Sequence, residues 1–319
     1  MQDLYDVSYH TRDEFYEGSA FIDTYTNNFI PHRKGYMIYT SGYTYDGDWS
    51  SGSWHGWGVL CFPDGRRYVG DFNMGQKEGQ GNFEWPNGNV YEGEFQNSHI
   101  NGQGTLTKTD GTILKGKWIN DQLHGEGEIY LPDGRRYSGE FRNSKLHGPG
   151  RFKWPEGMVY EGNFNNDFIN GHGIYTIPDG RKYEGSFCNS QKHGNGTFKW
   201  PSGDTYIGEF KNDKMSGDGV LKYANGTKFV GEFVNNKKLK GIFTDKDGKS
   251  KAEVWGSNGL IKSSKKSNNL AKLSEQLVKW SEIISTAKDT LSFISNNTSA
   301  ICNIVSVVGA IIGGILSVI

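Results

Sequence analysis

The stretch Tyr91-Glu92-Gly93-Glu94-Phe95 decides the fold, because close variants of it recur along the chain at a fixed spacing. Each copy places a large apolar residue, a glycine and an aromatic residue at alternate positions. Nine copies start 23 residues apart, at Tyr45, Tyr68, Tyr91, Leu114, Tyr137, Tyr160, Tyr183, Tyr206 and Phe229. A fixed period of this length is typical of repeat arrays, so the sequence predicts a fold built by stacking small units.

Each unit reads as a β-hairpin. Tyr68, Gly70 and Phe72 alternate along the chain, so they share one face of a strand. A glycine-containing connection follows, and the second strand stops at the turn sequence Pro86-Asn87-Gly88. Because adjacent hairpins can pair edge to edge, the predicted fold is an all-β repeat: an elongated single antiparallel sheet of hairpins, followed by an α-helical tail. One face collects the aromatic side chains, and the glycines leave room for the rings.

The second half of each unit carries a Gly-x-Gly pattern, for example Glu78-Gly79-Gln80-Gly81 and His124-Gly125-Glu126-Gly127. Together with the repeated Tyr-x-Gly-x-Phe pattern, these residues closely resemble the MORN repeat. The resemblance covers most of residues 43–256, with departures at Leu114, at Phe229 and at Lys240-Gly241-Ile242-Phe243, where the second glycine is missing. It implies an array of MORN hairpins whose aromatic trough can accept a helix.

Composition divides the chain into five expected segments. Residues 1–42 form an amino-terminal cap, in which Tyr16-Glu17-Gly18-Ser19-Ala20 is a divergent, out-of-register copy of the motif. Such a unit covers the first strand edge of an array. Residues 43–256 form the repeat array and 257–267 a basic linker rich in Ser, Lys and Asn. Residues 268–295 are expected to form an amphipathic heptad helix, and residues 296–319 a hydrophobic membrane segment.

The helix prediction rests on apolar residues that follow alternating steps of three and four, at Leu270, Leu273, Leu277, Trp280, Ile284, Ala287, Leu291 and Ile294. This spacing indicates one apolar stripe along a helix. Three uses of that stripe stay open: self-association as a coiled coil, docking into the aromatic trough of its own array, or docking on a partner.

The membrane prediction rests on the last residues, because Ala300 to Ile319 are almost wholly apolar and no charge follows Asp289. Twenty such residues just cross the hydrocarbon core of a bilayer. Gly309 and Gly313 have the spacing that lets membrane helices pack closely. The sequence therefore predicts a single-pass, tail-anchored protein with a cytoplasmic array; the alternative is a buried hydrophobic tail. Lipid headgroups are expected at Lys262, Lys265 and Lys266.

Charge and cysteine content exclude several functional classes. The residues before Lys237 carry a net charge of -7 and those from Lys237 onward +6, so the array lacks the basic face that nucleic acid needs. Cys61, Cys188 and Cys302 are too few and too scattered for a disulfide framework, and the first residues lack a secretory signal. Both features favour the cytosol.

No catalytic or metal-binding pattern is present. The chain has no nucleophile elbow, phosphate-binding loop or kinase signature, so neither an enzyme nor a cofactor is expected. Histidines recur near the Gly-x-Gly positions, but equivalent residues of adjacent units lie about 9 to 10 Å apart, two strand spacings. That separation is too large for shared zinc ligands, whose nitrogens lie about 2 Å from the ion.

The leading functional hypothesis is a non-enzymatic, membrane-anchored scaffold or tether that presents its array to a helical protein partner or a second membrane. In outline the arrangement resembles a compact junctophilin: array, helix and carboxyl-terminal anchor. Two alternatives are a membrane-active, pore-forming or oligomerising protein with the array as sensor, and a soluble cytoskeletal or ciliary scaffold. A homo-oligomer is a further partner hypothesis. Partner contacts are expected at Trp85, Trp154, Trp200, Tyr91, Tyr160 and Phe95.

Overall fold

The computed structural model describes residues 4–256 and 259–265, which form 23 β-strands. The chain divides into two compact units, residues 1–145 and 146–319. Within each unit, strands that follow one another in sequence pair antiparallel, as a meander of hairpins. The predicted all-β class with antiparallel hairpins is confirmed. The predicted tail, residues 268–295 and 296–319, lies outside the described residues.

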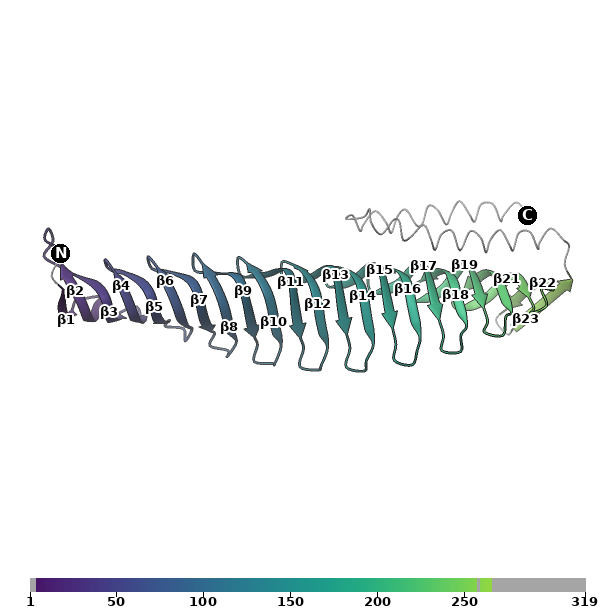
Figure 1. Ribbon diagram of the computed structural model, residues 1–319, viewed down its shortest axis with the longest axis horizontal. Helices are drawn as coiled ribbons and strands as arrows, with labels where there is room; N and C mark the ends of the chain where they lie inside the picture. Colours follow the sequence, from purple (N-terminus) through teal and green to yellow (C-terminus); the bar gives the residue numbers. More distant parts are fainter. Residues whose placement is uncertain (1–3, 257–258, 266–319) are drawn as a thin grey trace. The chain divides into compact units, whose positions relative to one another are not determined.

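In the first unit the hairpins follow one another from β1 to β12 (Figure 1). The strands are β1 (Tyr5–His10), β2 (Glu14–Ile22), β3 (Phe29–Tyr39), β4 (Thr44–Ser50), β5 (Ser53–Cys61), β6 (Arg67–Asn73), β7 (Gln76–Glu84), β8 (Val90–Gln96), β9 (His99–Thr107), β10 (Ile113–Ile119), β11 (Gln122–Tyr130) and β12 (Arg136–Arg142).

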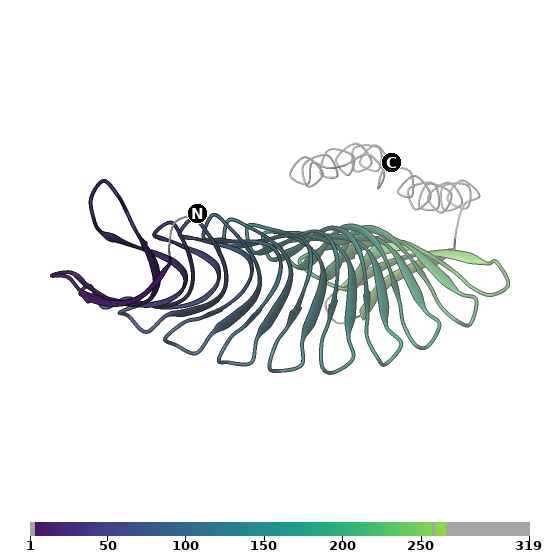
Figure 2. The same ribbon diagram turned by 60° about the vertical axis from the view of Figure 1, so that its left-hand side comes forward.

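The second unit continues with the same alternation of seven- and nine-residue strands up to β20. The strands are β13 (Lys145–Lys153), β14 (Val159–Asn165), β15 (Phe168–Thr176), β16 (Lys182–Cys188), β17 (Gln191–Lys199), β18 (Thr205–Lys211), β19 (Lys214–Lys222), β20 (Lys228–Val234), β21 (Lys237–Thr244), β22 (Ser250–Gly256) and β23 (Gly259–Lys265). Figure 2 shows how strongly the individual strands of each unit curve.

Tight two-residue turns join the strands of each repeat hairpin, from β4–β5 to β20–β21. Between β8 and β9, Asn97 and Ser98 both have positive φ, 51° and 67°. This conformation matches the twist of the paired strands, and Asn, Asp, Ser and Gly tolerate it best. The side chain in the second turn position also reaches the preceding hairpin: the Ser98 hydroxyl accepts a hydrogen bond from the Lys77 backbone N–H at 3.1 Å. The turns therefore fix neighbouring hairpins to each other as well as closing each one.

A β-bulge lies inside each repeat motif. In β8 the register with β9 shifts between Gly93 and Phe95, which leaves the carbonyl of Glu94 out of the ladder. The Tyr91 hydroxyl donates a hydrogen bond to that carbonyl at 3.3 Å. Equivalent bonds recur in the other tyrosine-led motifs, for example Tyr68 to Asp71 at 2.9 Å. The repeated tyrosine thus pairs the main-chain group that the bulge exposes.

Glycine is required where each ring crosses the backbone. Gly93 and Gly104 face each other across β8 and β9, and a Cβ built on Gly93 would lie 2.5 Å from the Cα of Gly104. A Cβ on Gly104 would meet the ring and hydroxyl of Tyr91. These glycines leave the space in which the tyrosine ring lies flat over the next strand, as the sequence predicted.

The first residues contain strands with the same chemistry. Tyr16 is 0% exposed and its hydroxyl donates a hydrogen bond to Ser19 O at 2.7 Å, so Tyr16-Glu17-Gly18-Ser19-Ala20 packs as a copy of the motif. The segment expected as the cap holds β1, β2 and β3, and β3 pairs with β4 of the first regular hairpin.

The other end differs from the expectation. Residues 259–265, expected within a basic linker, form strand β23, which pairs with β22. Pairing uses backbone groups, so the polar side chains of this segment do not prevent it. Residues 251–255, at the end of the expected array, lie in β22.

Candidate protein-binding face

The aromatic face is the side of the sheet that carries the motif tyrosines and phenylalanines. In the first unit, the Tyr91 ring packs edge-on against Phe95 of its own strand at 5.4 Å and against Trp118 of the next repeat at 5.6 Å. In the second unit, Tyr183 packs in the same way between Phe187 and Phe210. Each tyrosine is thus enclosed by a glycine below and aromatic edges on two sides, which builds a core in a single sheet.

That core contains three of the six predicted partner contacts. Tyr91 and Tyr160 are 0% exposed and Phe95 is 3% exposed, so their rings contact the array itself. Alternation along the strand predicts the correct face, but it gives no measure of how far neighbouring rings cover a side chain. Trp85, Trp154 and Trp200 are half-buried and keep surface that a partner can reach.

The three tryptophans occupy equivalent positions, directly after a nine-residue strand and before a Pro-x-Gly turn. Each packs against the phenylalanine two residues earlier, with ring centroids 4.7 Å apart for Phe83 and Trp85 and 4.5 Å for Phe152 and Trp154. Four other repeats place a different apolar residue there, and all four are half-buried, whereas the repeat after Trp85 places Lys108 there. We call this set the apolar rim: Phe62, Trp85 and Leu131 in the first unit, and Trp154, Ile177, Trp200 and Tyr223 in the second.

Lysines on the aromatic face are a feature that the sequence reasoning missed. Lys77 Nζ lies 4.5 Å from the ring centroid of Phe83 and within 5.9 Å of three further rings, Tyr68, Phe95 and Phe62. In the second unit, Lys192 lies near Tyr183 and Phe198, and Lys238 near Tyr223, Phe229 and Trp255. The 23-residue register could have found them, because equivalent positions hold Trp54, Ile100, Leu123, Leu146, Ile169 and Met215.

Burial lowers the pKa of two of these lysines, Lys77 and Lys192. It lowers the pKa of Lys77 to about 8, and the nearby Arg66 adds to the effect while Asp121 opposes it. Burial also lowers the pKa of Lys192, whose Nζ lies 3.9 Å from Asp213. The rings offset part of the desolvation cost through cation–π attraction. The aromatic face therefore combines apolar surface with partly desolvated positive charge.

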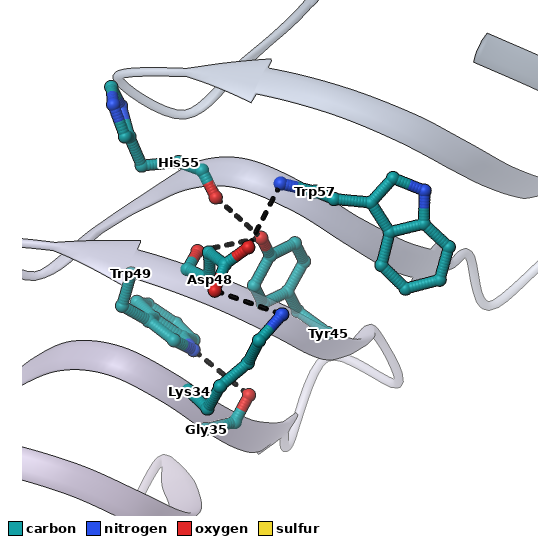
Figure 3. A network of polar contacts seen from close by, with 7 residues as sticks. All are labelled: Lys34, Gly35, Tyr45, Asp48, Trp49, His55 and Trp57. Atoms are coloured by element: carbon teal, nitrogen blue, oxygen red, sulfur yellow. Dashed lines mark hydrogen bonds and ion pairs between the residues drawn. The ribbon is translucent and has the colours of Figure 1, made fainter.

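The opposite face is polar and carries its own network (Figure 3). Asp48 of β4 accepts from Lys34 Nζ at 2.9 Å and from the Trp57 backbone N–H at 3.2 Å. On the other side of the same bulge, the Tyr45 hydroxyl donates to Asp48 O at 2.8 Å. The bulge residue thus joins β3, β4 and β5 through one side chain and one carbonyl. Asp71 repeats the backbone contact with the Gln80 N–H, at 3.1 Å.

The predicted lipid-headgroup lysines and helix-packing glycines lie at or beyond the end of the described residues. Lys262 lies exposed on β23 and Lys265 ends that strand, while Lys266, Gly309 and Gly313 lie outside the described residues. Within residues 4–256 and 259–265, no helix has the length and apolarity to span a membrane. Over the same residues, no three His, Cys, Asp or Glu side chains gather closely enough to hold a metal ion.

Comparison with solved structures gives low similarity. The TCP domain of SAS-4 (dCPAP) from Drosophila melanogaster, solved with a proline-rich motif of Ana2, is 12% identical, with 56% of this chain and 84% of that chain covered and a TM-score of 0.26. The G-box domain of the microcephaly protein CPAP is 15% identical, with 66% and 100% covered and a TM-score of 0.26. Virginiamycin B lyase from Staphylococcus aureus is 12% identical, with 72% and 83% covered and a TM-score of 0.16. None of these likenesses carries an argument about this chain.

No curated protein matches the sequence. The MORN repeat pattern, in contrast, matches eight consecutive segments that make up more than half of the chain: residues 45–66, 68–90, 91–113, 115–135, 137–159, 160–180, 183–205 and 206–228. The ninth unit of the sequence register, which starts at Phe229, lies beyond the matched segments, although β20 and β21 pair as a hairpin. The chain therefore belongs to the MORN repeat family.

Proposed function

We propose that the protein is a non-enzymatic scaffold, anchored in a membrane through residues 296–319, whose aromatic face binds an amphipathic helix. MORN repeats form a scaffold for protein or membrane binding, which gives the broader class. The apolar rim is the observation that carries the finer proposal. Its three tryptophans, Trp85 in the first unit and Trp154 and Trp200 in the second, are half-buried at the edge of the aromatic face.

The chemistry of this surface suits an amphipathic helix with acidic flanks. Rigid aromatic side chains cost little conformational entropy on binding, and tryptophan is enriched at binding hot spots. Lys77 and Lys192 place positive charge beside the rings, where a carboxylate would recover the interaction that burial weakens. The occupant is either a helical partner protein or residues 268–295 of this chain.

Photo-crosslinking tests the helix proposal. A photoreactive phenylalanine derivative is placed in the full-length protein at Trp154 or Trp200, and a synthetic peptide of residues 268–295 is the probe. Lys153 and Lys199 are matched controls, because each is exposed and the alternation places it on the opposite face. Crosslinks at the tryptophans and none at the lysines support a helix site on the aromatic face with residues 268–295 as its occupant. Equal labelling at all sites refutes a specific site there, and no labelling refutes residues 268–295 as the occupant. A peptide with its heptad order scrambled controls for general stickiness.

Membrane anchoring is tested separately. Full-length protein and a variant lacking residues 296–319 are expressed in cells, and the membranes are washed with alkaline carbonate. We expect the full-length protein to stay with the membranes and the truncated variant to be released. Release of the full-length protein into the soluble fraction contradicts the anchor and favours the soluble scaffold. Release of the protein would not affect the crosslinking experiment, because its peptide probe is added in solution and needs no membrane.

A further inference from the structure

The amino-terminal strand β1 presents an open sheet edge. Among the described residues β1 pairs only with β2, in continuous register from Tyr5 opposite Ala20 to His10 opposite Phe15. Sheet edges usually carry lysine, proline or a bulge that blocks further pairing. β1 contains no Lys or Pro, and no bulge interrupts its pairing with β2.

Strand β23 of the same chain, unlike β1, carries features that block pairing with a further strand. It carries Lys262 and Lys265, and its pairing with β22 is shifted between Val254 and Trp255. These are the devices that discourage another strand from adding. The difference between the two strands indicates that β1 is suited to pairing in a way that β23 is not.

The direction of the backbone groups in β1 follows from its turn. The Thr11 N–H donates to Glu14 O at 2.9 Å, so Thr11 and, by alternation, Tyr9, Val7 and Tyr5 direct their hydrogen-bonding groups toward β2. The N–H and C=O groups of Asp6, Ser8 and His10 consequently point to the open edge. A strand that adds there must pair with these three residues.

We propose that β1 pairs with β1 of a second copy of this chain, antiparallel, with Ser8 facing Ser8 across a twofold axis. In this register Asp6 of each copy faces His10 of the other, so all outward backbone groups of Asp6, Ser8 and His10 are paired. Each carboxylate then lies opposite an imidazole, which can donate a hydrogen bond to it, so the edge is self-complementary in its side chains as well as in its backbone.

The side chains agree with this arrangement. Opposed residues in an antiparallel pair lie on the same face, so Val7 meets Tyr9 of the second copy and extends the aromatic face across the junction. Tyr9 is already packed against Tyr16 and Phe29. On the polar face, Ser19 holds Asp6 by a hydrogen bond of 3.0 Å, which orders the carboxylate before the second copy binds.

Disulfide trapping in the full-length protein tests the register. In a background with Cys61, Cys188 and Cys302 replaced by alanine, Ser8→Cys is expected to form an intermolecular disulfide, since directly hydrogen-bonded residues have Cα atoms about 5.5 Å apart. Ser263→Cys on β23 is the matched control, because Ser263 is exposed on a strand with one described neighbour. Trapping at Ser8 but not at Ser263 supports the proposal, whereas equal trapping at both, or none at Ser8, overturns it.

Light scattering in detergent solution gives an independent measurement. The full chain is expected to shift from 35.7 kDa toward twice that mass as its concentration rises. Ser8→Lys places like charges at the twofold axis and should weaken association at least about tenfold, while Ser8→Thr retains it. Ser8→Pro, the second variant, removes an N–H that points to the open edge and should also weaken association. A monomer at all concentrations, or a dimer that Ser8→Lys and Ser8→Pro leave unchanged, overturns the proposal.

Discussion

The hydroxyl of Tyr183 lies 2.9 Å from the main-chain oxygen of Ser186, the residue that the bulge in β16 leaves out of the ladder. The ring is 1% exposed, and it contacts Phe187 and Phe210. One side chain therefore supplies both the hydrophobic core of its repeat and the hydrogen bond that completes its backbone.

The two contributions of Tyr183 can be separated by mutation. We expect Tyr183→Phe to lower the free energy of unfolding by about 1 to 2 kcal/mol, because the Ser186 carbonyl loses its donor in a buried site. Tyr183→Ala should cost about 3 to 5 kcal/mol, because it also removes the ring. Chemical denaturation followed by tryptophan fluorescence measures both. Tyr25→Phe is the control, since Tyr25 is 99% exposed; a loss as large as that of Tyr183→Phe would contradict the assignment.

Stability should fall in alkaline solution. Burial raises the pKa of Tyr9 to about 12, and it also raises the pKa of Tyr68, Tyr160 and Tyr206. The folded state therefore holds the phenolic protons more tightly than the unfolded chain, where tyrosine ionises near pH 10. The stabilisation is complete below that pH and is lost as the pH rises through the folded pKa values. Denaturation midpoints at successive pH values should decline from about pH 10 upward; a flat profile to pH 12 would refute this.

Lys77 should be destabilising at neutral pH. Burial lowers its pKa to about 8, so as the pH falls from the ordinary lysine pKa of about 10.4 to 8 the unfolded chain binds a proton that the folded state does not. Stability is lost over this window, and the loss is complete below pH 8. Lys77→Met should raise the free energy of unfolding at pH 7 by about 1 to 2 kcal/mol, less than the full desolvation term because the cation–π contacts are lost. Met215 already occupies the equivalent position in another repeat.

Two measurements check the Lys77 prediction. An NMR titration of the lysine side chains should show one resonance that moves near pH 8 in the wild type and is absent in Lys77→Met. Lys211→Met, at an exposed position, should change stability little. A Lys77 titration at the ordinary lysine pKa, or a destabilised Lys77→Met, would show that the rings hold the charged form.

Gly104→Ala should damage the fold by steric overlap alone. Gly104 has no positive φ, so alanine is compatible with its backbone, but the added Cβ meets the ring of Tyr91. We expect a loss of at least about 3 kcal/mol, the upper end for overpacking, because the ring has no free side to move to. Gly226→Asn is the control, since nothing lies within 4 Å of a Cβ there and asparagine tolerates its positive φ of 84°.

A double mutant tests the cause of that loss. The repeat led by Leu114 shows how the site accepts a smaller side chain, because no atom of Leu114 is among the nearest neighbours of a Cβ at Gly127. Tyr91→Leu should therefore recover part of the stability lost in Gly104→Ala. Strictly additive losses in the two single mutants would show that the ring and the glycine are not coupled.

The sequence predicted the hairpin array because its signals are local and repeated. Alternation assigned Tyr68, Gly70 and Phe72 to one face, and all three are buried in β6. The bulge after the motif glycine was not predictable by the same reasoning, because alternation assumes an unbroken ladder while the register shifts before Phe72. Strand β23 was missed because backbone pairing does not require apolar side chains.

The candidate site was predicted less completely. The sequence selected large aromatic residues as partner contacts, but burial depends on how many neighbours cover each ring. Phe95 is enclosed by Tyr91, and by Tyr68 of the preceding repeat, whereas Trp85 lies at the end of its row and stays half-buried. Lys77 escaped notice because a single lysine in a strand usually marks a solvated face, and only comparison of equivalent positions places it among rings.

The meander of consecutive hairpins has a consequence during synthesis. Every strand pairing within a unit joins neighbours in the sequence, so no strand must wait for a distant partner to be translated. A nascent chain can close each hairpin as it leaves the ribosome and lay it against the one already folded. The growing end then always presents the next unpaired edge, which the following strand of the same chain covers before a foreign strand can.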